Sequence, residues 1–132
     1  MGRIIAITNQ KGGVGKTTTA INLSACLAEA GQRVLAVDFD PQGNTTSGLG
    51  LEKGNLDNTV YELLMGECKL EECIFQSVQE RLDVMPSDMD LSGAEIELLD
   101  IQNKESILKD YLEKVEDKYD FIIIDLSLIH IS

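Results

Sequence analysis

The pattern of apolar and polar positions predicts a strand, a helix and a second strand in the first part of the chain. Residues 3–8 are rich in β-branched side chains, which is typical of a buried parallel strand. From Thr17 the apolar positions recur at helical spacing, and Gly31 provides a signal for the end of the helix. Residues 33–38 form the second apolar run. This order favours a parallel sheet with a right-handed crossover. The predicted apolar face of the helix consists of Ala20, Leu23, Leu27 and Ala30.

The middle of the chain carries weaker signals. Residues 41–54 contain four glycines and no periodicity, so we expect a loop there. Residues 59–62 match a capping box that would open a helix ending at Gly66. Residues 82–85 predict a third strand, which ends at Pro86.

Two more helices and a fourth strand are predicted in the last third. Residues 92–95 match a second capping box, which would open a short helix through residue 99. A longer helix is predicted over residues 107–115, where apolar side chains share one face and charged side chains the other. Residues 121–125 are the clearest strand. Together these elements predict one α/β domain, a parallel sheet with helices on both faces.

Charged residues are distributed unevenly along the chain. The 132 residues have a formal net charge of -12, with four basic and three acidic residues in 1–50 but seven basic and twenty acidic in 51–132. Such an acidic chain without a Lys/Arg cluster should repel nucleic acid. No apolar run approaches the roughly 20 residues of a membrane span, and the start lacks the layout of a secretory signal. We therefore expect a cytoplasmic protein.

The three cysteines argue against both a disulfide framework and a metal site, because their number is odd and no Cys-x-x-Cys pair occurs. Reduced thiols are expected instead. Cys26 falls on the predicted apolar side of the first helix, so we expect it to be buried. Cys68 and Cys73 lack His or Cys partners at metal-ligand spacing.

The stretch between the first strand and the first helix has the composition of a phosphate-binding loop. Its glycines would let backbone N–H groups surround an anion at the positive end of the following helix. In such a loop Lys16 neutralises the β- and γ-phosphates of a nucleotide, and the Thr17 hydroxyl binds Mg²⁺. Asp125 ends an apolar strand and has the placement of a Walker B carboxylate near that metal. The predicted nucleotide-binding residues are Lys11, Gly12, Gly13, Val14, Gly15, Lys16, Thr17 and Thr18.

The loop departs from the general Walker A pattern, because Gln10 occupies the first glycine position and a second lysine, Lys11, follows it. In these features the chain resembles the deviant Walker A ATPases, a family that includes ParA-type partition proteins and MinD. The resemblance implies a P-loop NTPase fold. It also implies that Lys11 reaches across a dimer to the partner's nucleotide, so that Lys11 and Lys16 are both catalytic.

Residues 38–44 resemble the Walker A′ motif of the same family. The resemblance assigns Asp38 to the Mg²⁺ shell and Asp40 to the activation or positioning of the attacking water. Residues 41–44, Pro-Gln-Gly-Asn, are similar to the ParA/Soj partition branch rather than to MinD. The resemblance thus implies Thr17, Asp38 and Asp125 as metal ligands, the carboxylates acting through water.

Similarity to the partition branch implies an ATPase that uses ATP and Mg²⁺, forms an ATP-sandwich homodimer and acts in chromosome or plasmid segregation. A ParB-like stimulating protein and nonspecific DNA would be its partners, although DNA binding is not expected of so acidic a chain. Two alternatives remain open at this point. The chain could be a nucleotide-binding module without turnover, or a cobyrinate-type amidation enzyme with the same loop, which the Pro-Gln-Gly-Asn block disfavours.

The resemblance ends after Asp125, where family members continue with a Pro-Pro-Ser-like turn. We therefore expect residues 1–125 to be the N-terminal part of a P-loop ATPase domain, truncated after the Walker B strand. Residues 126–132 are expected to be an atypical tail of non-native origin, and His130 receives no role.

Overall fold

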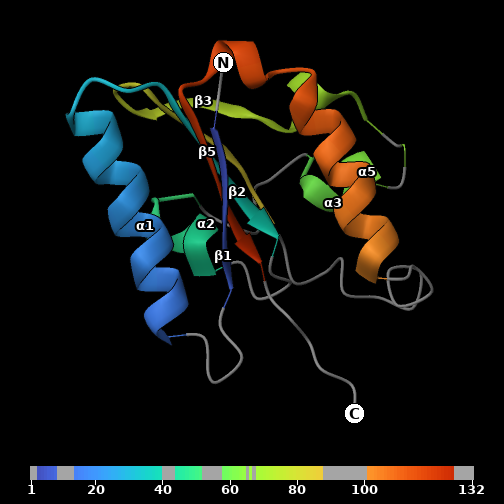
Figure 1. Cartoon of the computed structure of the whole chain (residues 1–132), viewed down its shortest axis with the longest axis horizontal. Helices are drawn as coiled ribbons and strands as arrows, with labels where there is room; N and C mark the ends of the chain where they lie inside the picture. The colour runs from blue at the N-terminus through green and yellow to red at the C-terminus, as the bar shows by residue number, and fades with distance from the viewer. Residues whose placement is uncertain are drawn as a thin grey trace.

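A five-stranded sheet forms the centre of the molecule, here seen in a computed structural model that describes residues 3–8, 14–39, 44–51, 58–64, 66, 68–87 and 101–126 (Figure 1). The strands lie in the order β1-β5-β2-β4-β3. The pairs β1–β5, β5–β2 and β2–β4 are parallel, and β3 runs antiparallel to β4. The strands are β1 (Arg3–Thr8), β2 (Val34–Phe39), β3 (Phe75–Gln79), β4 (Leu82–Met85) and β5 (Phe121–Leu126).

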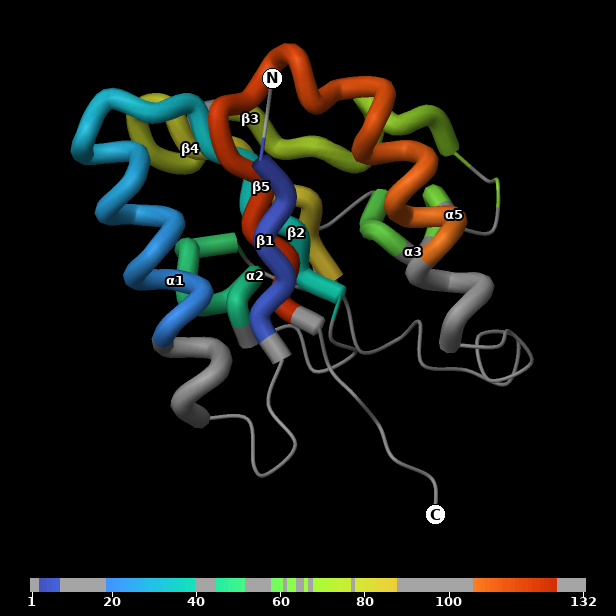
Figure 2. The backbone as a smooth tube through the Cα atoms, in the orientation of Figure 1, coloured from blue at the N-terminus to red at the C-terminus, as the bar shows by residue number. Residues whose placement is uncertain are grey.

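Helices cover both faces of this sheet, as the α/β prediction requires. Helices α1 and α2 lie on one face, and α3 and α5 lie on the other (Figure 2). The α-helices are α1 (Val14–Glu29), α2 (Asn44–Gly48), α3 (Val60–Leu64) and α5 (Ile101–Glu113). Two 3-10 helices, η2 (Leu70–Cys73) and η4 (Glu116–Lys118), complete the described elements.

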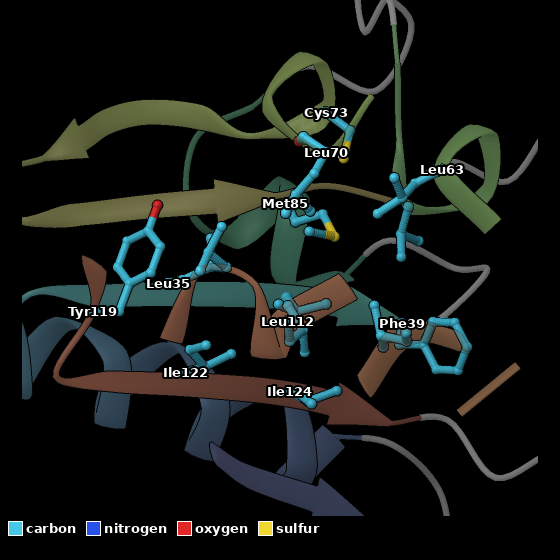
Figure 3. Packing of buried hydrophobic residues seen from close by; sticks show 14 residues of the cluster. Leu35, Phe39, Leu63, Leu70, Cys73, Met85, Leu112, Tyr119, Ile122 and Ile124 are labelled. Carbon is cyan, nitrogen blue, oxygen red and sulfur yellow. Dashed lines mark hydrogen bonds between the residues drawn. The ribbon is translucent and has the colours of Figure 1, made fainter. Parts of the chain in front are cut away.

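Helices on both faces of the sheet explain why the central strands β2 and β5 carry apolar side chains on both faces until the aspartate near the end of each strand. In β2, Leu35 and Val37 belong to the core cluster under α3 and α5, whereas Val34 and Ala36 belong to the cluster under α1. Figure 3 shows the first cluster, in which Leu112 of α5 lies over the sheet. Both faces of β2 are therefore buried. Its parallel pairing with β4 and β5 confirms the parallel sheet predicted from the strand–helix–strand order.

Most of the predicted elements are confirmed. The four predicted strands correspond to β1, β2, β4 and β5, and the helix predicted over residues 107–115 lies largely within α5. The stops at Gly31 and Gly66 are also confirmed, since both adopt positive φ angles, +94° and +76°. At the start of α3, the Thr59 hydroxyl donates to the Glu62 carboxylate at 2.7 Å. The helix predicted to open at residues 92–95 lies outside the described residues.

Strand β3 is an element that the sequence did not predict. It joins β4 through a two-residue turn, Glu80–Arg81, in which Arg81 has a φ of 65°. Hairpin turns of this kind usually carry Gly or Asn, and neither is present, so the usual signal is missing. The Arg81 guanidinium donates from Nε to the carbonyl of Ala28 at 2.9 Å. This bond to the end of α1 helps to hold an arginine in the left-handed conformation.

The predicted inner face of α1 was partly wrong. Ala30 and Cys26 are exposed, whereas Ala20, Ser24 and Ala28 are buried. These three small residues recur every fourth position and let the helix backbone lie close to the sheet. The residues Leu23 and Leu27 flank this line and are half-buried. The most deeply buried line of α1 therefore consists of small residues, with larger apolar side chains packed beside it.

The proposed boundary after Asp125 stays a prediction, and β5 extends one residue beyond it. Leu126 is the last residue of β5 and lies in register with Thr8 and Phe39. Residues 127–132 lie outside the described part, so the non-native tail remains a prediction. Within the described residues, no helix is long and apolar enough to cross a membrane.

Candidate nucleotide site

The carboxyl ends of two neighbouring strands bring two of the predicted acidic residues together. Asp38 near the end of β2 and Asp125 near the end of β5 are direct register partners. Residues opposite each other on parallel strands project to the same face, here the face covered by α1 and α2. Both carboxylates are buried, with exposed fractions of 0% and 1%. The structure therefore brings together two residues that lie 87 positions apart in the sequence.

Helix α2 supplies hydrogen bonds to both carboxylates. The Thr45 hydroxyl donates to Asp125 Oδ2 at 2.5 Å. Thr46 donates to Asp38 Oδ2 twice, from its backbone N–H at 2.8 Å and from its hydroxyl at 2.7 Å. Buried carboxylates are costly unless they are hydrogen-bonded or paired with a cation, so these contacts explain how two acids can share a dry site.

The presence of α2 corrects the prediction of a loop over residues 41–54. The helix forms because Thr45 and Thr46 are anchored on the strand ends and Gly48 packs against Ile21 of α1. A Cβ atom at position 48 would collide with Ile21 Cδ1, so glycine permits the close approach of the two helices. Tertiary contacts of this kind are invisible to local periodicity.

A third strand end contributes through Ser87, which follows β4. The backbone N–H of Ser87 donates to the Thr46 hydroxyl oxygen at 2.9 Å. The carbonyl of Pro86, the preceding residue, accepts a bond from the N–H of Val60 at the start of α3. Sequence reasoning missed Thr45, Thr46 and Ser87. The only signal in the sequence was the pair of threonines directly after residues 38–44, the segment that resembles the Walker A′ motif.

The phosphate-binding loop is only partly within the described residues. Helix α1 begins at Val14, so Gly15, Lys16, Thr17 and Thr18 lie in its first turns. Because α1 connects β1 to the parallel strand β2, its amino terminus lies at the same sheet edge as the carboxylates. The predicted residues Lys11, Gly12, Gly13 and Asp40 lie outside the described part, and their roles remain predictions.

The donor set at this edge fits a hard divalent cation. Carboxylate and hydroxyl oxygens are the ligands that Mg²⁺ prefers, and it usually needs only one or two carboxylates because phosphates and water complete its shell. Within the described residues no group of three or more His, Cys, Asp or Glu side chains could hold a metal by itself. The two carboxylates therefore match a metal that is bound together with a phosphate ligand.

The amino-acid sequence is similar to a known protein family and to several curated proteins. A family model described as an AAA domain matches residues 2–128. The sporulation initiation inhibitor protein Soj of Bacillus subtilis is 56% identical over 125 residues, 95% of this chain and 49% of Soj. The chromosome partitioning protein ParA of Myxococcus xanthus is 51% identical over 125 residues, 95% of this chain and 44% of that protein. The chain thus spans about half the length of the curated relatives it matches.

Solved structures share the fold. Cobyrinic acid a,c-diamide synthase from Mycobacterium smegmatis with a bound ATP analogue and magnesium matches with a TM-score of 0.85 and 40% identity, over 96% of this chain and 52% of that chain. The cell division ATPase MinD from Pyrococcus furiosus matches with a TM-score of 0.75 and 33% identity, over 98% and 52% of the two chains. Taken with the matching family model, these similarities show that the chain belongs to the AAA-domain family of P-loop ATPases and, within it, to the ParA/Soj type.

Proposed function

We propose that this protein binds and hydrolyses ATP with Mg²⁺, and that nucleotide-driven dimerisation makes it act in chromosome or plasmid segregation. The observation that carries the proposal is the buried pair Asp38 and Asp125, held in register at the sheet edge where α1 begins. The M. smegmatis synthase and a Pyrococcus horikoshii MinD, both structural neighbours, were solved with magnesium and a nucleotide. Their likeness supports the choice of ATP and Mg²⁺.

The proposed roles come from the chemistry of a phosphate-binding loop and, for Asp38 and Asp40, from the resemblance to the deviant Walker A ATPases. Backbone N–H groups of residues 12–18 would hold the phosphates, and Lys16 would neutralise the β- and γ-phosphates. Thr17, Asp38 and Asp125 would hold the metal, which supplies further charge neutralisation when bound. Asp40 would orient the attacking water. These assignments agree with the order of the motifs along the chain.

The proposed partners come from the partition relatives. A second copy of the chain would complete the ATP site through Lys11, and a ParB-like protein would stimulate turnover. Nonspecific DNA is a partner by resemblance to the partition proteins only, since residues 51–132 are too acidic to provide a surface that binds DNA. A cytoplasmic location is consistent with these roles.

A second candidate function is a cobyrinate-type amidation reaction. The 40% identity and TM-score of 0.85 to the M. smegmatis synthase favour it as the main alternative. The 56% identity to Soj and the Pro-Gln-Gly-Asn block favour partition. A nucleotide-binding module without turnover is the remaining alternative.

Replacement of Lys16 tests the phosphate site. We expect Lys16→Ala to weaken ATP binding about tenfold to a hundredfold, because a charge-assisted hydrogen bond contributes about 1.5–3 kcal/mol. Titration of a fluorescent ATP analogue in the presence of Mg²⁺ measures the affinity. Lys109→Ala, which removes an exposed lysine of α5, is the matched control and should bind like the wild type.

Phosphate release measured in parallel separates the alternatives. Release of phosphate from ATP alone supports the ATPase, and binding without release supports the module without turnover. Release that requires a carboxylic acid and an ammonia donor supports the amidation enzyme. Equal ATP affinity of Lys16→Ala and wild type would refute the assignment of Lys16.

A further inference from the structure

We propose that Thr46 is a positioning residue for Asp38, that Thr45 serves Asp125 in the same way, and that α2 thereby sets the geometry of the metal site. This inference rests on the proposed function, because it concerns residues that act through the two expected metal-binding carboxylates. It adds to the site a short helix that the motifs did not include.

The bonds around Thr46 fix the direction of its hydroxyl group. A threonine hydroxyl has one hydrogen to donate and two lone pairs that accept. The Ser87 N–H donates to the Thr46 hydroxyl oxygen at 2.9 Å, and the Thr46 hydroxyl donates its own hydrogen to Asp38 Oδ2 at 2.7 Å. The Thr46 N–H reaches the same oxygen at 2.8 Å. Thr46 therefore ties one oxygen of Asp38 to both α2 and the segment that follows β4.

Thr45 extends the arrangement to the second carboxylate. Its hydroxyl donates to Asp125 Oδ2 at 2.5 Å, so two consecutive residues of one helix hold two neighbouring strand ends. The contact of Gly48 with Ile21 seats the same helix on α1. The orientation of both carboxylates is consequently coupled to the helix that starts at the phosphate loop.

Hydrogen bonds to a metal-binding carboxylate matter because they orient the carboxylate before the cation binds. Removal of a hydrogen-bond partner from a metal-binding carboxylate typically lowers metal affinity or activity by about 10–100-fold. We expect a loss in this range for Thr46→Val, which removes the hydroxyl and keeps the shape. The Thr46→Ser variant keeps the hydroxyl and should retain most of the wild-type behaviour.

The test measures metal dependence rather than turnover. The 132-residue chain, wild type or variant, is titrated with a fluorescent ATP analogue in EDTA and then with Mg²⁺ at fixed nucleotide. We expect Thr46→Val to raise at least tenfold the Mg²⁺ concentration that gives half of the maximal fluorescence change. The affinity for the nucleotide in EDTA should stay within about twofold of the wild-type value. Thr59→Val is the matched control, because Thr59 is equally buried but its hydroxyl bonds to Glu62.

The outcomes separate this inference from the proposed function. A wild-type chain whose nucleotide binding ignores Mg²⁺ overturns both. Mg²⁺ dependence in the wild type with an unchanged midpoint in Thr46→Val overturns the positioning role alone, and so does an equal shift in Thr59→Val. If Thr46→Val does not fold, Thr45→Val and Thr45→Ser carry the same comparison at Asp125, with the same result required.

Discussion

At the scale of single residues, the contact between Arg33 and Asp120 shows how a surface pair can depend on the backbone. The Asp120 carboxylate accepts a bond from the Arg33 N–H at 2.8 Å, and the Arg33 guanidinium lies 3.4 Å from its other oxygen. These two groups, the backbone N–H first, lower the pKa of Asp120 below its ordinary value. The Asp120 N–H in turn donates to the Arg33 carbonyl, so the pair ties together the starts of β2 and β5.

The lowered pKa predicts a change of stability with pH. A group whose pKa is lower in the folded state contributes stability above its unfolded pKa and loses it as the pH falls through the folded value. We expect Asp120→Asn to be less stable than the wild type at pH 7, and the difference to shrink below about pH 4. Urea unfolding from pH 7 to pH 2.5 measures it, with Asp117→Asn, an exposed acid of η4, as the control. A difference that is constant over this range would contradict the linkage.

At the scale of elements, α1 combines a helical sequence with a contact surface that its pattern did not reveal. The inner line Ala20, Ser24 and Ala28 is buried, and the Ser24 hydroxyl has no hydrogen-bond partner among the described residues. A buried hydroxyl without a partner costs about 1–3 kcal/mol, and serine is also a weaker helix former than alanine. Ser24 is therefore a local weakness in an otherwise well-packed helix.

Substitution of this serine should stabilise the protein. We expect Ser24→Ala to raise the free energy of unfolding by about 1 kcal/mol, because it removes the orphan hydroxyl and improves helix propensity. Equilibrium denaturation at pH 7 measures the change. Asn22→Ala on the exposed side of α1 isolates the propensity part and should give about half as much or less. A destabilised Ser24→Ala would show that the hydroxyl makes a useful bond in solution.

At the scale of the whole molecule, the sheet is deeply buried at its centre and open at one side. Strand β2 is buried along its whole length, whereas β1 pairs only with β5 among the described strands and keeps half-buried isoleucines. The acidic residues lie mainly beyond residue 50, away from the near-neutral segment that contains the phosphate loop. The separation holds along the sequence only, because Asp125 of the acidic segment is the register partner of Asp38 at the candidate site.

Replacement of Lys11 tests the proposed dimer, because this lysine would contribute to the ATP site of a second copy of the chain. A lysine supplied by a second copy would act like an arginine finger, a contact that contributes on the order of 10³–10⁵ to the rate. We expect Lys11→Ala to lower ATP hydrolysis by about 10³-fold while ATP affinity changes only a few-fold. Phosphate release measured against chain concentration should rise more than linearly in the wild type. Equal losses of binding and hydrolysis would refute the role in trans.

The features that depend on neighbouring residues were predictable from the amino-acid sequence. The apolar run of residues 3–8 predicted a buried parallel strand, and β1 is parallel to β5 but only half-buried. The runs of β2 and β5 predicted strands, the glycine-lysine loop predicted phosphate binding, and Asp38 and Asp125 were identified as carboxylates at strand ends. Each of these signals is carried by neighbouring residues, so periodicity and motif spacing contain them. The roles of Lys11 and Asp40 lie outside the described residues and stay predictions from resemblance.

How these elements pack together depends on contacts between different elements, which local sequence patterns do not contain. Strand β3 turns on Arg81, whose positive φ is accompanied by a bond to the end of α1, and no turn motif announces it. Helix α2 exists because Thr45 and Thr46 bond to carboxylates on two different strands. The inward side of α1 follows from the close fit of small residues against the sheet. The stabilising contacts join different elements, some far apart in the sequence, such as Thr45 with Asp125 and Arg81 with Ala28, and a local pattern does not contain them.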